Sequence, residues 1–262
     1  MTTTGLHCEG DLELSLVVPA FNEVGDIAGV LRSAASYLEE AGIDYEINVV
    51  DDGSHDGTAG VLGRESGKNP RVRVVTHQRN QGYGAALRSG IAVARGKRIL
   101  VSDGDGQFDI SNMDAMWARR DEADMIIGYR RRRRDPIIRR VAGWLYSRVV
   151  IPCLLGGRYR DVNCGFKLIS RRVLTGMELT SNGALISAEL LTRARMEGAS
   201  FVEVGVEHRP RRHGCGSGLL PRVVLTMLRE LTAFRLRAVA QLAGNRGASL
   251  PSGSDTVKSR AS

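Results

Sequence analysis

Residues 99–105 read Ile-Leu-Val-Ser-Asp-Gly-Asp, an apolar run followed by two carboxylates one residue apart. The run predicts a buried strand, and Asp103 and Asp105 then lie in the turn at its end. Carboxylate oxygens are the ligands that Mg²⁺ and Mn²⁺ prefer, and such ions usually keep positions for phosphate oxygens. Asp-Gly pairs also form ordinary turns, so this pair alone leaves both interpretations open.

A second acidic pair follows another apolar run. Asp51 and Asp52 come directly after Ile-Asn-Val-Val at 47–50, so each pair ends a predicted strand. Both pairs in equivalent places indicate a metal-assisted nucleotide site more strongly than either pair does alone.

Strand and helix patterns alternate from Leu14 to Gly128, which predicts βαβ units and a mostly parallel sheet. In open parallel sheets, ligands bind beyond the carboxyl ends of the strands. The polar clusters all fall at such ends, and this regularity favours an enzyme. The predicted strands cover residues 14–18, 47–50, 72–75, 98–101 and 124–128, and the clusters cover 19–23, 51–54, 80–84 and 103–107.

The second half begins with five consecutive arginines at 130–134. Apolar residues spaced from Ile137 to Leu155 follow, which predicts an amphipathic helix with a basic head. Such a helix either lies in a membrane interface, with its arginines on lipid phosphates, or packs on the core beside a solvated charge run. A strand is expected at 201–206 and a last helix from about Pro221.

Length and composition are those of an ordinary globular protein. The chain has 262 residues, of which 42% are hydrophobic and 25% are charged, so wholesale disorder is excluded. We expect a flexible N-terminus at 1–12, one α/β domain at 13–240 and a disordered, Gly/Ser-rich tail at 241–262. Within the domain, residues 13–128 form one half and residues 129–240, with the amphipathic helices, form the other.

The formal net charge of +8 favours acidic partners such as nucleotides, phosphate esters and anionic lipids. The four cysteines are far apart and fit neither a metal knuckle nor a disulfide framework, which indicates a reducing compartment. The chain shows no signal pattern and no run of about 18 apolar residues. We therefore expect a cytoplasmic protein, either free or bound peripherally at the cytoplasmic face of a membrane.

Six motifs occur in a fixed order along the chain, and together they resemble the family 2 glycosyltransferases of the GT-A fold. The resemblance is greatest to the group of dolichol-phosphate mannosyltransferases and polyprenyl-phosphate glycosyltransferases, and it covers roughly residues 14–236. The motifs are Val-Val-Pro-Ala-Phe-Asn-Glu (17–23), Val-Asp-Asp-Gly-Ser-His-Asp-Gly-Thr (50–58), Asn-Gln-Gly-Tyr-Gly-Ala-Ala (80–86), Asp-Gly-Asp-Gly-Gln (103–107), Asp-Val-Asn-Cys-Gly-Phe-Lys (161–167) and Arg-Arg-His-Gly (211–214).

The resemblance implies that residues 13–128 are a nucleotide-sugar half and residues 129–240 an acceptor half, and it implies a role for each matching position. Asp103, Asp105 and Arg211 are the implied catalytic residues, and Gln107 joins the two aspartates in holding Mg²⁺ or Mn²⁺. The implied nucleotide site consists of Pro19, Ala20, Phe21, Glu23, Asp52 and Gly53. The implied diphosphate and acceptor site consists of Arg130, Asp161, Arg211, Arg212 and Ser217.

The resemblance implies inverting, metal-dependent transfer of a sugar from a GDP- or UDP-sugar to a polyprenyl phosphate. A sugar hydroxyl as acceptor needs a carboxylate base, whereas a lipid phosphate is already ionised and needs none. The chain lacks the Gln-x-x-Arg-Trp pattern of hydroxyl-acceptor relatives, which favours a phosphate acceptor. Asp161 and Glu189 stay open as candidate bases, and Glu189 is equally open to interpretation as a structural partner of an arginine.

Three other functions fit the same sequence less well. A transferase of the same fold that acts on a small soluble metabolite is the nearest alternative. A basic nucleic-acid-binding protein is a remote one, because aromatic residues make up only 5% and no reading motif is present. A dinucleotide oxidoreductase needs Gly-x-Gly-x-x-Gly after the first strand, where residues 19–23 stand instead. The donor base and the sugar stay open.

Overall fold

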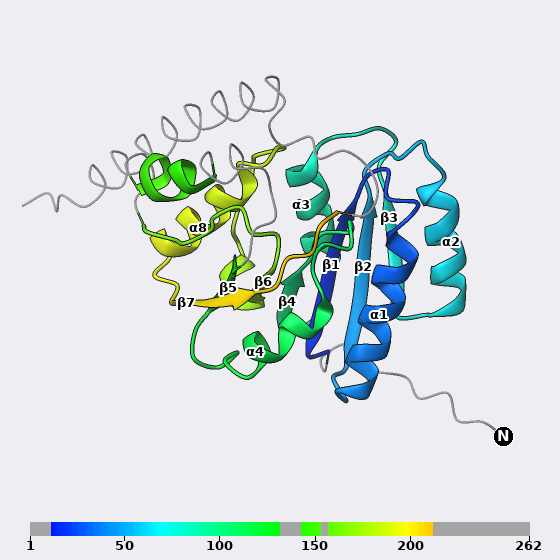
Figure 1. Ribbon diagram of the computed structural model, residues 1–262, viewed down its shortest axis with the longest axis horizontal. Coiled ribbons are helices and arrows are strands. Elements are labelled where there is room, and N and C mark those ends of the chain that lie inside the picture. The colour runs from blue at the N-terminus through cyan, green and yellow to red at the C-terminus, as the bar shows by residue number, and fades with distance from the viewer. Residues whose placement is uncertain (1–11, 132–142, 153–156, 212–262) are drawn as a thin grey trace, which may run out of the picture.

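The computed structural model describes residues 12–131, 143–152 and 157–211, and these residues form one seven-stranded sheet (Figure 1). The strand order is β3-β2-β1-β4-β6-β5-β7. All six predicted strands are present, four of them longer by one to three residues, and β6 is an additional strand. The strands are β1 (Leu14–Ala20), β2 (Tyr45–Asp51), β3 (Val72–Thr76), β4 (Arg98–Val101), β5 (Met125–Arg130), β6 (Lys167–Ser170) and β7 (Phe201–Val206).

The sheet is mostly parallel, as the sequence predicts. β1 pairs in parallel with β2 and β4, β2 with β3, and β5 with β7. β6 runs antiparallel to both of its neighbours, β4 and β5. The carboxyl ends of the parallel strands therefore share one edge with the amino end of β6. We call this the carboxyl edge.

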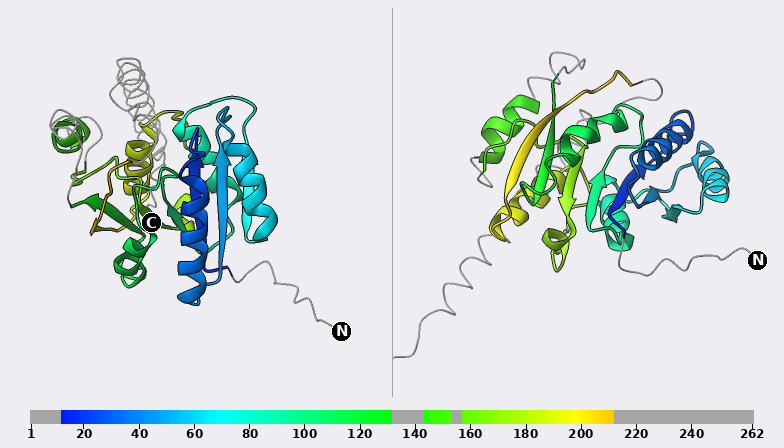
Figure 2. Two further views of the ribbon diagram at one scale, coloured as in Figure 1. Left: turned by 45° about the vertical axis from the view of Figure 1, so that its right-hand side comes forward. Right: turned by 90° about the horizontal axis from the view of Figure 1, so that it is seen from below.

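Helices cover both faces of the sheet (Figure 2). Side chains of α1, α2 and α4 join one hydrophobic cluster, and side chains of α3 and α8 join a second cluster on the other face. The helices are α1 (Ile27–Glu40), α2 (Thr58–Lys68), α3 (Tyr83–Val93), α4 (Met113–Trp117), α7 (Arg171–Leu174) and α8 (Ile186–Met196), with a 3₁₀ turn η1 (Ile110–Asn112) and a π-helical turn η2 (Tyr146–Val150).

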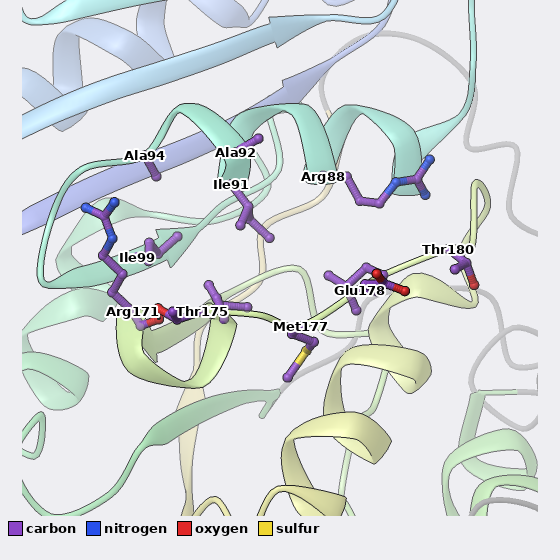
Figure 3. A pocket seen from close by; sticks show the side chains of 12 residues that line it. Arg88, Ile91, Ala92, Ala94, Ile99, Arg171, Thr175, Met177, Glu178 and Thr180 are labelled. Carbon is purple, nitrogen blue, oxygen red and sulfur yellow. Dashed lines mark hydrogen bonds between the residues drawn. The ribbon is translucent and has the colours of Figure 1, made fainter. Parts of the chain in front are cut away.

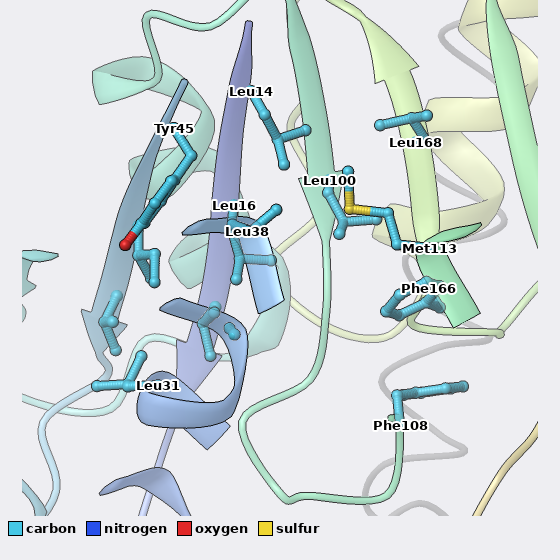
Figure 4. Packing of buried hydrophobic residues seen from close by; sticks show 14 of the residues in the cluster. Leu14, Leu16, Leu31, Leu38, Tyr45, Leu100, Phe108, Met113, Phe166 and Leu168 are labelled. Carbon is cyan, nitrogen blue, oxygen red and sulfur yellow. The ribbon is translucent and has the colours of Figure 1, made fainter. Parts of the chain in front are cut away.

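The spacing of apolar residues explains the first crossover helix. Ile27, Leu31 and Leu38 recur at helical spacing in α1, and all three are buried against the sheet. Gly42 follows the helix with φ of 64°, a left-handed conformation that glycine adopts without strain. Figure 4 shows Leu31 and Leu38 in the cluster that also contains Leu16 of β1.

β1 is buried on both faces, as expected for a central parallel strand. Its Leu14, Leu16 and Val18 lie in the cluster under α1, whereas Val17 lies in the cluster under α3. A Cβ on Gly90 of α3 would lie 2.4 Å from the Val17 Cγ1 atom. α3 therefore packs very close to the sheet, and its first residue, Tyr83, reaches the carboxyl edge.

The predicted amphipathic helix is described only in part, over residues 143–152, which are helical. Trp144, Leu145 and Val149 are exposed there, while Tyr146 and Ile151 are buried. The rest of that segment, the expected last helix from Pro221 and the expected tail at 241–262 lie outside the described residues. Within the described part of the chain, none of the helices has the length and apolar character needed to cross a bilayer.

Candidate active site

Asp103 follows β4 at the carboxyl edge and is held on two sides. The Tyr83 hydroxyl donates a hydrogen bond of 3.0 Å to its Oδ1 atom. The Gly165 backbone lies against its Oδ2 atom, so closely that a Cβ at position 165 would be 2.1 Å away. Burial raises the pKa of the Asp103 carboxyl, against the opposing effects of the Tyr83 hydrogen bond and the Lys167 charge.

Asp105 lies two residues further on, and its Oδ1 atom accepts a hydrogen bond of 3.1 Å from the Gln107 backbone N–H. Burial, and then the neighbouring Asp103 charge, raise the pKa of Asp105 to about 6. Burial likewise raises the pKa of Glu23, at the end of the turn after β1, to about 7. Three carboxyl groups with raised pKa values mark a place where a bound cation would relieve both burial and repulsion.

The donor set fits a divalent cation that is shared with a substrate. Among the residues that the structure describes, no three Asp, Glu, His or Cys side chains gather closely enough to hold a metal ion by themselves. Mg²⁺ commonly binds through one or two carboxylates plus substrate phosphate oxygens. Asp103 and Asp105 supply hard oxygen ligands of that kind, so they fit an ion that binds together with a diphosphate.

Arg211 reaches the acidic residues because a tether holds the segment after β7. The Arg209 N–H donates to the Gln107 carbonyl at 2.8 Å, and the Gln107 side-chain amide donates to the Arg209 carbonyl at 3.0 Å. Arg211 then pairs with Glu23, and its Nη2 atom lies 3.9 Å from the Asp105 Oδ2 atom. The Gln107 side-chain nitrogen thus serves the tether, which leaves the oxygen of that amide as the atom for the predicted metal contact.

Arg130 ends β5 and forms a two-pronged ion pair with Asp161. Its Nε and Nη2 atoms donate to the two Asp161 oxygens at 2.6 and 2.8 Å. The structure therefore brings together two residues that the resemblance assigned to the same diphosphate and acceptor site. Both oxygens of Asp161, a candidate base, already accept from a guanidinium.

Glu189, the other candidate base, is fully buried in α8. Its carboxylate accepts from the Thr180 N–H at 3.0 Å, the Ser181 N–H at 2.8 Å and the Arg193 Nε at 2.9 Å. The interpretation of Glu189 as the structural partner of an arginine agrees with these contacts.

Lys167 ends the motif at 161–167, but the sequence analysis gave it no role in the site. It is the first residue of β6, only 3% exposed, and its Nζ atom donates to the Cys164 carbonyl. Burial lowers its pKa, while the charges of Asp161 and Asp103 act in the opposite direction. β6 has only four residues, too few to show an alternating pattern, and its antiparallel direction puts its first residue at the carboxyl edge. A lysine opening an apolar run was the available signal.

Asp52 is 3% exposed and organises the turn before α3. Its Oδ1 atom lies 2.7 Å from His77 Nδ1 and accepts from the Gln81 N–H at 2.9 Å, and its Oδ2 atom accepts from the Gly82 N–H at 2.8 Å. The predicted contact with a nucleotide base must therefore share a carboxylate that this turn already uses. Gly53 adopts φ of 71°, and a Cβ there would lie 2.5 Å from the Arg79 carbonyl carbon.

The other predicted nucleotide residues follow β1 in an orderly way. Pro19 and Ala20 are buried as the last residues of the strand, and Phe21 beyond them is 38% exposed. The Phe21 ring packs edge-to-face against His55 at 5.7 Å. Phe21 is thus the aromatic surface at this end of the carboxyl edge. The predicted residues Arg212 and Ser217 lie outside the described residues.

The glycines before and within α3 do not form a phosphate loop. The Gly84 N–H donates to the Asn182 carbonyl at 2.7 Å. A Cβ on Gly82 would lie 2.5 Å from that same oxygen. These glycines allow the 180–182 loop to pack against the amino end of α3, which agrees with the rejection of a dinucleotide-binding loop.

A groove of about 620 Å³ lies between α3 and the 171–180 segment (Figure 3). Its lining is mainly apolar, with Ile91, Ile99 and Met177, and Arg88 and Arg171 also border it. None of the predicted site residues lines this groove. The candidate active site is therefore the carboxyl edge, where the charged residues converge.

The family model described as Glycosyl transferase family 2 matches residues 15–175, which is more than half of the chain. The chain belongs to glycosyltransferase family 2. The enzyme is thus a glycosyltransferase, as its motifs predict.

Individual relatives agree with this assignment. A dodecaprenyl-phosphate galacturonate synthase of Rhizobium johnstonii is 30% identical over 234 residues, covering 87% of this chain and 69% of that protein. A mouse dolichyl-phosphate beta-glucosyltransferase is 30% identical over 251 residues, covering 86% of this chain and 75% of that protein.

A solved structure confirms the GT-A fold. Glucosyl-3-phosphoglycerate synthase of Mycobacterium tuberculosis, crystallised with Mn²⁺, UDP and phosphoglyceric acid, superimposes with a TM-score of 0.61. The match covers 92% of this chain and 80% of that one, at 22% identity.

Proposed function

We propose that this glycosyltransferase moves a sugar from a nucleotide diphosphosugar to a polyprenyl phosphate, with Mg²⁺ or Mn²⁺ as cofactor. The observation that carries the proposal is the meeting of Asp103 and Asp105 with Arg211 and Arg130 at one edge of the sheet. Two sequence relatives that act on polyprenyl or dolichyl phosphates by name support the acceptor class.

The chemistry follows from where charge develops. The bond between the anomeric carbon and a diphosphate oxygen breaks, and negative charge builds on the leaving diphosphate. A divalent cation, when bound, neutralises that charge. Asp103 and Asp105 would hold the cation, and Arg211, positioned by the tether between Arg209 and Gln107, would bind diphosphate oxygens through its planar fork.

The acceptor half suits an anion that needs no deprotonation. A phosphate oxygen attacks the anomeric carbon from the side opposite the diphosphate, which inverts the configuration and gives a sugar-1-phospho-polyprenol. The candidate bases Asp161 and Glu189 are both engaged with arginines and backbone donors. The positive charges of Arg130 and Lys167 near Asp103 favour a phosphate on this side.

We also infer peripheral contact with an anionic membrane. Trp144, Leu145 and Val149 are 60%, 46% and 41% exposed on one short helical segment. That segment follows the arginine run at 130–134, and an apolar face beside basic residues is the usual arrangement of an interfacial helix.

A phosphorylated soluble acceptor is the second candidate. It is favoured by the likeness in fold to a synthase crystallised with phosphoglyceric acid. The same cationic side chains would also attract such an acceptor.

The experiment that tests the acceptor supplies radiolabelled UDP- and GDP-sugars with Mn²⁺ and either a polyprenyl phosphate or 3-phosphoglycerate. We expect label in the organic phase only when the polyprenyl phosphate is present. Label transferred only to 3-phosphoglycerate would replace the lipid acceptor with the soluble one. Transfer to neither acceptor, by a protein whose cooperative thermal unfolding shows that it is folded, would contradict the proposal.

A further inference from the structure

Tyr83 connects α3 to the acidic pair, and neither the motifs nor the proposed chemistry gives it a role. Its hydroxyl donates to the Asp103 Oδ1 atom at 3.0 Å. Among the described residues, this is the one hydrogen bond that reaches the Asp103 carboxylate. The Asp103 carboxylate can only accept, so the Tyr83 hydroxyl is the donor of this bond.

The same carboxylate also lies against backbone. A Cβ on Gly165 would be 2.1 Å from the Asp103 Oδ2 atom and 2.5 Å from its Oδ1 atom. Asp103 is therefore confined by a hydrogen-bond donor on Oδ1 and by main chain close to both oxygens. Rotation of its carboxylate would break the Tyr83 bond.

Tyr83 is itself held in place from the acceptor half. The next residue, Gly84, donates its N–H to the Asn182 carbonyl at 2.7 Å. Arg88, one turn further along α3, donates to the Asn182 side-chain oxygen at 2.7 Å. Glu189 in turn fixes the neighbouring residue Ser181. Hydrogen bonds, together with the backbone between them, thus link α8 to the Asp103 carboxylate.

We propose that Tyr83 is a positioning residue whose hydroxyl holds Asp103 in the orientation that binds a divalent cation jointly with the sugar diphosphate. The inference rests on the proposed function, since it presumes that Asp103 is a metal ligand. It differs from a packing role, because a phenylalanine would fill the same space without holding the carboxylate. Partners that orient metal ligands in this way typically contribute 10- to 100-fold to metal affinity, as a rough range.

The test compares Mn²⁺ binding by the wild type and Tyr83→Phe in the presence of UDP or GDP, with free Mn²⁺ measured by electron paramagnetic resonance. We expect the Mn²⁺ dissociation constant of Tyr83→Phe to rise about tenfold. The matched control is Tyr45→Phe, which removes a buried hydroxyl that donates to Glu39 at 2.8 Å, remote from the carboxyl edge. Its Mn²⁺ dissociation constant should equal that of the wild type.

Equal Mn²⁺ affinity in Tyr83→Phe and wild type would overturn the positioning role and leave the proposed function intact. A wild type that binds no Mn²⁺ with either nucleotide would overturn the metal-dependent function, and this inference with it. If Tyr83→Phe fails to unfold cooperatively, Tyr83→Leu is measured in its place, with the same expected and overturning results.

Discussion

The two ends of the carboxyl edge carry opposite charges. β1, β2 and β4 bring Glu23, Asp52, Asp103 and Asp105 to it, whereas β5, β6 and the segment after β7 bring Arg130, Lys167 and Arg211. The sheet order places β4 directly beside β6, so the acidic pair and the cationic side chains meet at the centre. Under the proposed function, the acidic half, which we call the donor side, suits a cation with a leaving diphosphate. The cationic half, which we call the acceptor side, suits an incoming anion.

The halves also differ in how their charges are balanced. On the acceptor side, Arg130 and Asp161 neutralise each other through two short hydrogen bonds. On the donor side, Asp103, Asp105 and Glu23 all have raised pKa values despite the nearby Arg211. The donor side therefore lacks a positive charge, which a substrate-bound cation would supply. On the acceptor side, the charge of Asp161 is already matched by that of Arg130.

The largest expected effect comes from breaking the balanced pair. Arg130→Met removes both hydrogen bonds that the guanidinium donates to the buried Asp161 carboxylate, and breaking a buried ion pair typically costs about 3–5 kcal/mol of unfolding free energy. Adding Asp161→Leu should restore much of that stability in urea unfolding. It should not restore KM for the polyprenyl phosphate, because the arginine is still missing. A double variant with wild-type KM would limit Arg130 to a structural role.

Removing one acidic residue from the donor side should have the opposite profile. Asp105→Asn should lower kcat about 100–1000-fold, the usual loss for one strong electrostatic contact in a transition state. Its melting temperature should stay level or rise, because a like-charge repulsion with Asp103 is removed. The control is Asp121→Asn, whose side chain is 80% exposed. A fully active Asp105→Asn enzyme would refute the assignment.

Glu189 should affect stability and leave the chemistry unchanged. Against the cost of burial, hydrogen bonds from Ser181 and Arg193 hold the pKa of this carboxyl below its usual range. A lowered pKa contributes stability that is present above the ordinary glutamate pKa, about 4.3, and is lost as pH falls through the folded value. Glu189→Gln should cost about 1–3 kcal/mol in urea unfolding at pH 7.

That difference between Glu189→Gln and wild type should shrink near pH 4. The pH dependence of kcat should be the same in both proteins. A large loss of kcat in the variant, together with loss of the acidic limb of its pH profile, would instead identify Glu189 as the catalytic base.

The smallest effect is expected at the surface of the acceptor half. Trp144→Ala should lower the affinity for anionic vesicles, measured by cosedimentation, by about 1 kcal/mol, or roughly fivefold. The reason is that the variant loses the contact of an aromatic side chain with lipid. Met196→Ala is the matched control, because Met196 is 46% exposed at the end of α8. Equal loss in both variants would contradict a specific membrane face.

The donor half could be predicted because its signals are local in sequence. Each acidic pair directly follows an apolar strand, and the alternation of strands and helices fixes their common edge. The contacts of those residues were not predictable, because they join distant parts of the chain. Tyr83 meets Asp103, and Gly165 meets the same carboxylate, only after α3 and β6 have packed.

The backbone N–H groups that donate to Asp52 could not be predicted from the pattern of side chains either. Asp52 was assigned to a nucleotide base, yet three groups of its own chain already surround its carboxylate. Lys167 was overlooked because the antiparallel direction of β6 follows from sheet pairing, which a four-residue run does not reveal.

The most direct test of the account is calorimetric titration of the wild type with UDP and GDP, in Mn²⁺ and in EDTA. The account predicts that one nucleotide binds in Mn²⁺, and that EDTA or Asp105→Asn abolishes this binding. A nucleotide that binds equally tightly in EDTA would contradict the claim that Asp103 and Asp105 bind a diphosphate through a shared cation.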